Sequence, residues 1–184
     1  MNAIKLNIFL YPAIAVMLCV LLFSYVLKKS NQKSDFKNYI LIVFVVAVIL
    51  NIVWELAQLY LYNNAVYNIA HILFCALASI ADAIMITLMY LLFAVVLKNA
   101  LWIRSVKWYQ ILILVVVGAT GAILSEKRHL NIGTWDYSYW MPIIPIVKVG
   151  LSPVLQFMLL PTLSYILSLK YLQKQLKTIN NFNH

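Results

Sequence analysis

Three carboxylic acids interrupt apolar stretches of this sequence and are its strongest candidates for chemistry. Glu55 and Asp82 each lie within a long apolar run, and Glu126 closes another. A charged side chain near the centre of a bilayer costs about 3 kcal/mol or more, so an acid in such a position is usually functional. The chain has only 5 acidic residues, and three in apolar runs exceed what helix packing requires. We therefore predict that Glu55, Asp82 and Glu126 are catalytic, with a purely structural pairing of buried charges as the alternative.

Amide and basic side chains recur around these acids. Asn51, Glu55 and Gln58 follow i, i+4 and i+7 spacing, which places them on one face of a helix. We expect Lys148, together with Asn51 and Gln58, to tune the protonation and orientation of the acids. The residues predicted to bind substrate are Asn51, Trp54, Gln58, His71, Trp135, Tyr137, Lys148 and Gln156.

The residue types favour acid–base chemistry over metal chemistry. A carboxyl group in an apolar cavity favours its neutral form and can protonate an unreactive alkene or epoxide. The π-faces of Trp54, Trp135 and Tyr137 could stabilise a developing carbocation, although such aromatics also form belts at membrane interfaces. The Glu126-x-x-His129 pair is a single motif interrupted by basic residues, so we predict no metal and no cofactor.

Two short segments resemble known membrane enzymes. Asn51-Ile52-Val53-Trp54-Glu55 resembles the N-x-x-W-E segment of the fungal membrane-bound meroterpenoid cyclases. Glu126 followed by Gly133-Thr134-Trp135-Asp136-Tyr137 resembles the E…G-x-W-x-Y pattern of integral membrane carotenoid enzymes of the lycopene cyclase type. The first resemblance implies that Glu55 takes part in protonating an epoxide or alkene. The fungal proteins are longer, with a second acid late in the chain, so Asp82 and Glu126 are only candidates for the second acid.

The elements that carry these residues are predicted to be membrane-spanning helices. Of the 184 residues, 65% are hydrophobic and 10% are charged, whereas a soluble domain has about half its residues apolar and about a quarter charged. Within lipid, long apolar runs must satisfy their own backbone hydrogen bonds as helices. We predict an all-α polytopic bundle with spans at about 7–27, 39–62, 67–97, 108–125 and 141–171, followed by a frayed tail at 178–184. The prolines of the last span predict a kink or break, most plausibly at 150–153.

The charges of the connections predict an orientation. Basic residues concentrate in the first and third connections and in the tail, and the second connection carries no charge. The positive-inside rule then places the N-terminus outside and the C-terminus inside. With this orientation, the polar residues converge on the outer half of the bundle. We expect residence in a bacterial plasma (inner) membrane.

These features predict a carboxylate-lined pocket for acid–base chemistry, cyclisation or isomerisation, on an isoprenoid or another lipid. The alternative is a non-catalytic transporter, lipid-binding protein or assembly subunit. The expected partners are membrane lipids and a lipophilic small-molecule substrate, and a homodimer is left open. The net charge of +9 is assigned to topology and lipid headgroups, not to nucleic acid.

Overall fold

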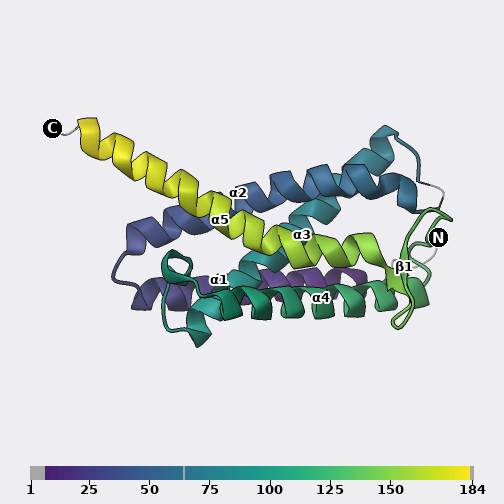
Figure 1. Cartoon of the computed structure of the whole chain (residues 1–184), viewed down its shortest axis with the longest axis horizontal. Coiled ribbons are helices and arrows are strands. Elements are labelled where there is room, and N and C mark those ends of the chain that lie inside the picture. Colours follow the sequence, from purple (N-terminus) through teal and green to yellow (C-terminus); the bar gives the residue numbers. More distant parts are fainter. Residues whose placement is uncertain (1–6, 64, 183–184) are drawn as a thin grey trace.

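Five long helices form an all-α bundle in the computed structural model, which describes residues 7–63 and 65–182 (Figure 1). They are α1 (Asn7–Lys29), α2 (Lys33–Gln58), α3 (Ile69–Val96), α4 (Trp108–Asn131) and α5 (Leu151–Phe182). Short 3-10 helices follow α2 (η1, Leu59–Leu61) and precede α4 (η2, Trp102–Ser105). The predicted fold class is therefore confirmed.

Four of the described segments are long and apolar enough to cross a membrane: Lys33–Leu61, Ile69–Val96, Trp108–Asn131 and Leu151–Thr178. Their outer faces carry exposed apolar side chains such as Val53, Leu77 and Leu124, each more than 60% exposed. A surface of this kind suits lipid as the solvent. Helix α1 has 23 residues, which is long enough to span a hydrocarbon core of about 30 Å, and its role as the first span stays a prediction.

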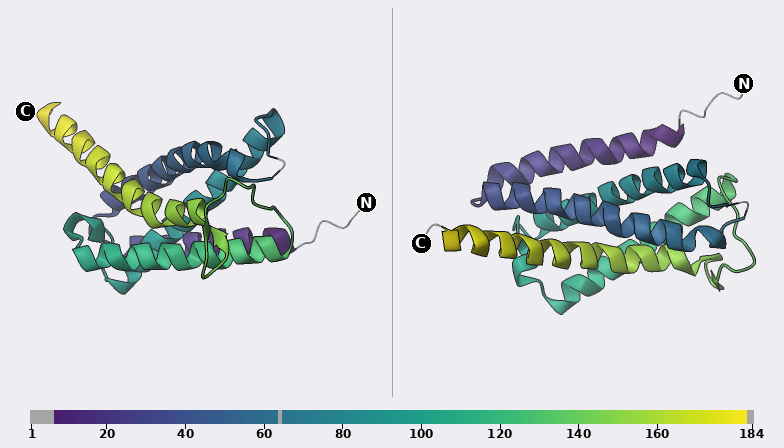
Figure 2. Two further views of the ribbon diagram at one scale, coloured as in Figure 1. Left: turned by 45° about the vertical axis from the view of Figure 1, so that its right-hand side comes forward. Right: turned by 90° about the horizontal axis from the view of Figure 1, so that it is seen from above.

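Helix α2 is central to the packing. It contacts α3 and α5, while α5 also packs on α4 and α1 packs mainly on α3. Helix α1 forms one edge of the bundle, far from α5 (Figure 2). The core includes four buried rings from α2, α3, η2 and α5, namely Tyr39, Tyr90, Trp102 and Tyr165. Each of their polar atoms is hydrogen-bonded to a backbone carbonyl, so the rings bury their apolar area without leaving a polar group unpaired.

The three basic segments lie at one end of the bundle (Figure 1). Two of these segments, the turn between α1 and α2 and the segment containing η2, are joined there by Arg104, whose guanidinium lies 2.8 Å from the Asp35 carboxylate. Both side chains are about one-third exposed, so the pair contributes little to stability. The shared end agrees with the loop arrangement that the charge pattern predicts.

The helices that carry the last two predicted spans have other bounds than those spans. The segment 141–150 is a hairpin of β1 (Ile143–Ile144) and β2 (Val149–Gly150), and α5 begins only at Leu151. Pro142 and Pro145 explain the difference, because proline lacks the N–H that a helix needs and restricts the residue before it. The predicted break at 150–153 is thus the start of a helix, where Pro153 is tolerated in the first turn.

The helix ends also differ from expectation. Helix α5 continues through Pro161 and extends to Phe182, so residues 178–182 are helical where a frayed tail was predicted, and 183–184 lie outside the described residues. Helix α4 continues to Asn131 instead of ending at Ser125. This extension places Glu126 within a helix, about one and a half turns before its end.

Candidate functional site

The polar face of α2 meets α3 and α5 around one amide group. The Nε2 atom of Gln156 on α5 lies 2.9 Å from Asn51 Oδ1 and 3.0 Å from Glu55 Oε1, both on α2. The same nitrogen lies 3.1 Å from Asp82 Oδ2 on α3. Because both distances share one nitrogen atom, these two carboxyl oxygens lie within about 6 Å of each other. The structure thus brings together four of the residues singled out from the sequence.

Gln58 and Ser152 complete this group, which we call the carboxyl–amide cluster (Asn51, Glu55, Gln58, Asp82, Ser152 and Gln156). Gln58 Nε2 donates to Glu55 Oε1 at 3.0 Å and to Gln156 Oε1 at 3.1 Å. Ser152 Oγ donates to Gln58 Oε1 at 2.7 Å. Ser152 was not predicted as a site residue, although it precedes Gln156 by four residues and therefore shares its helix face.

Burial differs between the amides and the acids of the cluster. Asn51, Gln58 and Gln156 are 0%, 4% and 2% exposed, whereas Glu55 and Asp82 are only partly buried. The buried amides are held by hydrogen bonds, including one from Asn51 Nδ2 to the Ala47 carbonyl at 2.7 Å. The geometry therefore fixes the acids from one side and leaves each of them some accessible surface.

Lys148 does not belong to this cluster, which corrects the sequence prediction. It is exposed in the turn between β1 and β2, with φ of 56°. Its backbone N–H is bonded to the Ile144 carbonyl at 2.8 Å, so it closes a tight hairpin turn. The prediction failed because it placed Lys148 two turns inside a helix that begins three residues later. Among these described side chains, no ion pair links Lys148 to Glu55 or Asp82.

Glu126 lies in a second hydrogen-bonded group, formed with the loop that follows α4. Its side chain is buried, and its Oε2 accepts a short hydrogen bond from the Tyr137 hydroxyl. Trp135 Nε1 lies 3.4 Å from the same oxygen. The stacked ring of His129, 4.2 Å from that of Trp135, supports the indole. Trp135 and Tyr137 thus hold a buried acid. The next aromatic residues of the loop, Tyr139 and Trp140, are instead 94% and 70% exposed and suit a membrane interface.

Tyr62, immediately after η1, packs against the group around Glu126 and was not predicted. Its ring centroid lies 6.1 Å from that of Trp135 and 5.8 Å from that of Tyr137. Burial raises the pKa of Tyr62, and negative charge at Glu126 and then at Glu55 raises it further. The phenol is therefore within electrostatic reach of both acid groups. A lone tyrosine at the end of a span gives no sequence signal for this position, because the loop that covers it is distant in the chain.

The docked loop explains how these groups are brought together. Tyr62 and Tyr137 form an antiparallel bridge, flanked by bonds from Asn63 N–H to the Asp136 carbonyl at 2.9 Å and from Ser138 N–H to the Leu61 carbonyl at 2.9 Å. The loop 132–140 is therefore attached to the chain at the end of η1 and just after it. Burial also raises the pKa of Tyr137, and its hydrogen bond to Glu126 acts in the same direction.

Two other predicted binding residues have different surroundings. The His71 ring lies 3.0 Å from Asn68 Oδ1, which also caps the start of α3 by accepting the His71 backbone N–H. The Trp54 ring packs against the hydrophobic core, and its indole nitrogen is buried without a hydrogen-bond partner in the described part of the chain. Neither side chain is bonded to Glu55 or Asp82 in the hydrogen-bond network above.

Residues 7–63 and 65–182 contain no cluster of side chains suited to binding a metal ion. No group of three or more His, Cys, Asp or Glu side chains there is arranged to hold an ion. Two carboxyl groups held by one amide can instead bind, release and transfer protons. No protein-family model, curated protein or solved structure matches the chain, so the functional argument rests on this geometry.

Proposed function

We propose that the carboxyl–amide cluster is an intramembrane acid–base site that acts on a lipophilic substrate. The observation that supports this function is the pair of contacts from Gln156 Nε2 to Glu55 Oε1 and Asp82 Oδ2, at 3.0 and 3.1 Å. General acid–base catalysis needs a proton donor and a proton acceptor held at fixed positions. One amide nitrogen that binds two carboxyl groups from different helices provides such positions.

The proposed reaction is a cyclisation or isomerisation without net oxidation. One carboxyl group in its acid form, assigned to Glu55, donates its proton to an alkene or epoxide and becomes a carboxylate. A bond within the substrate moves to the resulting cationic carbon. The other carboxyl group, Asp82 in its carboxylate form, then removes a proton from a neighbouring carbon. The substrate is rearranged, and proton exchange between the two acids restores the starting state.

The surroundings of the site favour an apolar substrate in the isoprenoid class. The exposed apolar side chains on the spans support entry of the substrate from the bilayer. The rings of Tyr62 and Trp135, in the group around Glu126, offer π-faces for cationic intermediates. The resemblance of the segment from Asn51 to Glu55 to terpenoid cyclases points to the same class. We place the protein in a bacterial plasma membrane, with the cluster in its outer half.

A proton-coupled carrier is the second candidate function. The cluster joins α2, α3 and α5 through hydrogen bonds of Gln156. A change in the protonation of either acid would therefore change the contacts between three helices, which is what a carrier needs to couple protons to movement. In that case the acids bind protons without altering any lipid.

The decisive experiment compares lipids from cells that produce the protein or its variants. Glu55→Gln and Asp82→Asn keep the side-chain size but can neither donate nor accept the proton that the reaction transfers. Asp136→Asn, in the exposed loop, is the matched control. We expect the first two variants to lose a product lipid and accumulate its precursor, with the control resembling the parent protein.

Folding must be monitored in the same samples. Size-exclusion profiles in detergent and thermal unfolding should match between the Glu55→Gln and Asp136→Asn proteins. A folded Glu55→Gln protein that leaves the lipid profile of the parent unchanged would contradict the enzyme. Loss of proton uptake into proteoliposomes in the same variant would then support the carrier.

A further inference from the structure

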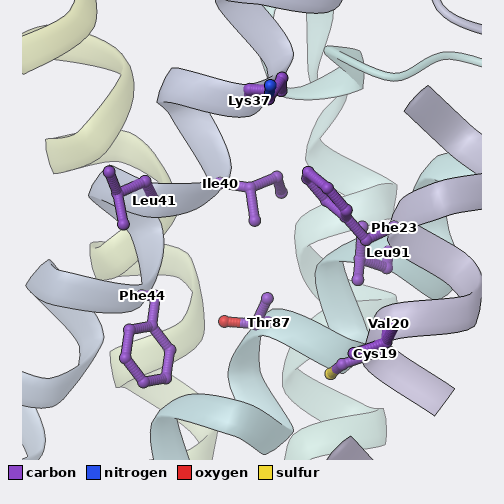
Figure 3. Close-up of a pocket in the computed structure, with 9 residues that line it drawn as sticks. All are labelled: Cys19, Val20, Phe23, Lys37, Ile40, Leu41, Phe44, Thr87 and Leu91. Atoms are coloured by element: carbon purple, nitrogen blue, oxygen red, sulfur yellow. The ribbon is translucent and has the colours of Figure 1, made fainter. Parts of the chain in front are cut away.

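An apolar groove lies between α1, α2 and α3, in the half of the bundle near the basic loops (Figure 3). It forms because α1 packs on α3 and makes few contacts with α2. Its volume is about 340 Å³, within the usual range for small-molecule sites. The groove contains none of the residues of the carboxyl–amide cluster.

The groove has one charged end and an apolar interior. Lys37, Ile40, Leu41 and Phe44 follow i, i+3, i+4 and i+7 spacing, so one face of α2 forms one wall. Figure 3 shows Lys37 at one end, with Phe44 and Cys19 at the other. From position 37 to 44 the helix rises by about 10 Å, which is a large part of the ~15 Å hydrocarbon depth of one leaflet.

Positive charge is concentrated at the same end. Lys37 is exposed at the groove, and Lys28, Lys29 and Lys33 are exposed at the adjoining ends of α1 and α2. The one acid of this region, Asp35, is engaged by Arg104 at 2.8 Å. The local charge is thus complementary to an anion at the membrane surface.

We propose that this groove binds an acyl chain of an anionic phospholipid, with Lys37 in contact with its headgroup. The apolar walls accept the chain, and the lysine selects the headgroup charge. The site belongs to the leaflet that faces the basic loops, which is the cytoplasmic leaflet in the predicted orientation. The proposal does not depend on catalysis at the carboxyl–amide cluster.

The test is native mass spectrometry of the purified protein in detergent, titrated with dioleoyl phosphatidylglycerol or dioleoyl phosphatidylcholine. Lys37→Gln removes the charge. Val20→Trp fills the groove from α1 at a side chain that is 59% exposed, so the fold should tolerate it. Lys170→Gln removes an exposed charge from α5, outside the groove lining, and is the control.

We expect the parent protein to prefer phosphatidylglycerol about fivefold, as one lysine near an anionic surface would give. Lys37→Gln should lose this preference and keep its affinity for phosphatidylcholine. Val20→Trp should weaken the binding of both lipids, and Lys170→Gln should change neither. Equal effects of the two lysine variants, or unchanged binding in Val20→Trp, would overturn the proposal.

Discussion

Gly118 on α4 packs directly against the backbone carbonyl of Phe157 on α5. A β-carbon at Gly118 would lie 2.0 Å from that oxygen, so no other residue fits without moving a helix. Pro161, four residues after Phe157, has no N–H to donate to this carbonyl within the helix. The close approach of α4 therefore covers a carbonyl that α5 leaves without its helical partner, as small residues do between membrane helices.

Gly118→Ala should destabilise the protein by about 1–3 kcal/mol or more, because the added methyl group meets backbone instead of a flexible side chain. Thermal unfolding in detergent would measure the effect. Gly121→Ala is the matched control, since a β-carbon there has no neighbour within 4 Å. Its stability should be unchanged or slightly higher, because alanine favours helix. Similar unfolding temperatures for the two variants would refute this packing.

Gln156→Leu should remove the shared donor of the carboxyl–amide cluster. Asn51, Glu55 and Asp82 would each lose a hydrogen bond, and an unsatisfied buried polar group costs about 1–3 kcal/mol. We expect a clear fall in unfolding temperature. Gln173→Leu, at an exposed position of α5, should have little effect. If both variants unfold alike, the cluster does not hold α2, α3 and α5 together.

The sequence predicted the parts of this site that depend on local periodicity. The spacing of Asn51, Glu55 and Gln58 placed them on one helix face, and all three are bonded to Gln156 or to one another. Asp82 and Gln156, which were expected in the same half of the bundle, are bonded to each other beside these residues. In both cases the hydrophobic pattern predicted which residues form a helix. The polar face of each helix then points toward the other polar faces, because polar groups are buried together.

Features that depend on the distant loop could not be predicted in this way. Glu126 was grouped with Glu55 and Asp82 as an acid of an apolar run, but its partners Trp135 and Tyr137 belong to a loop whose path is set by pairing with the segment that follows η1. Tyr62 was missed for the same reason. Lys148 was misplaced because the run that contains it is as apolar as a membrane span. Its two prolines nevertheless prevent a helix, and the backbone forms a hairpin.

Alkaline pH should destabilise the protein partly through Tyr62. Its pKa is raised above the ordinary value of 10.0 by burial and by nearby negative charge, so the folded state favours the neutral phenol. The resulting stability is present below pH ~10 and is lost as the pH rises above that value. Tyr62→Phe should therefore show a smaller fall in unfolding temperature between pH 9 and pH 11 than the parent protein. Tyr60→Phe, at a side chain that is 57% exposed, should fall as the parent does.

The orientation in the membrane can be tested with single cysteines in a Cys19→Ala, Cys75→Ala background. Tyr139→Cys lies in the loop beside the buried Glu126, at a side chain that is 94% exposed, and Asn31→Cys lies between the basic ends of α1 and α2. Because basic connections stay in the cytoplasm, a membrane-impermeant maleimide should label Tyr139→Cys on intact cells and Asn31→Cys only after lysis. The reverse pattern would move Glu126 and the carboxyl–amide cluster to the cytoplasmic half, and the substrate of the site would then have to enter from the inner leaflet.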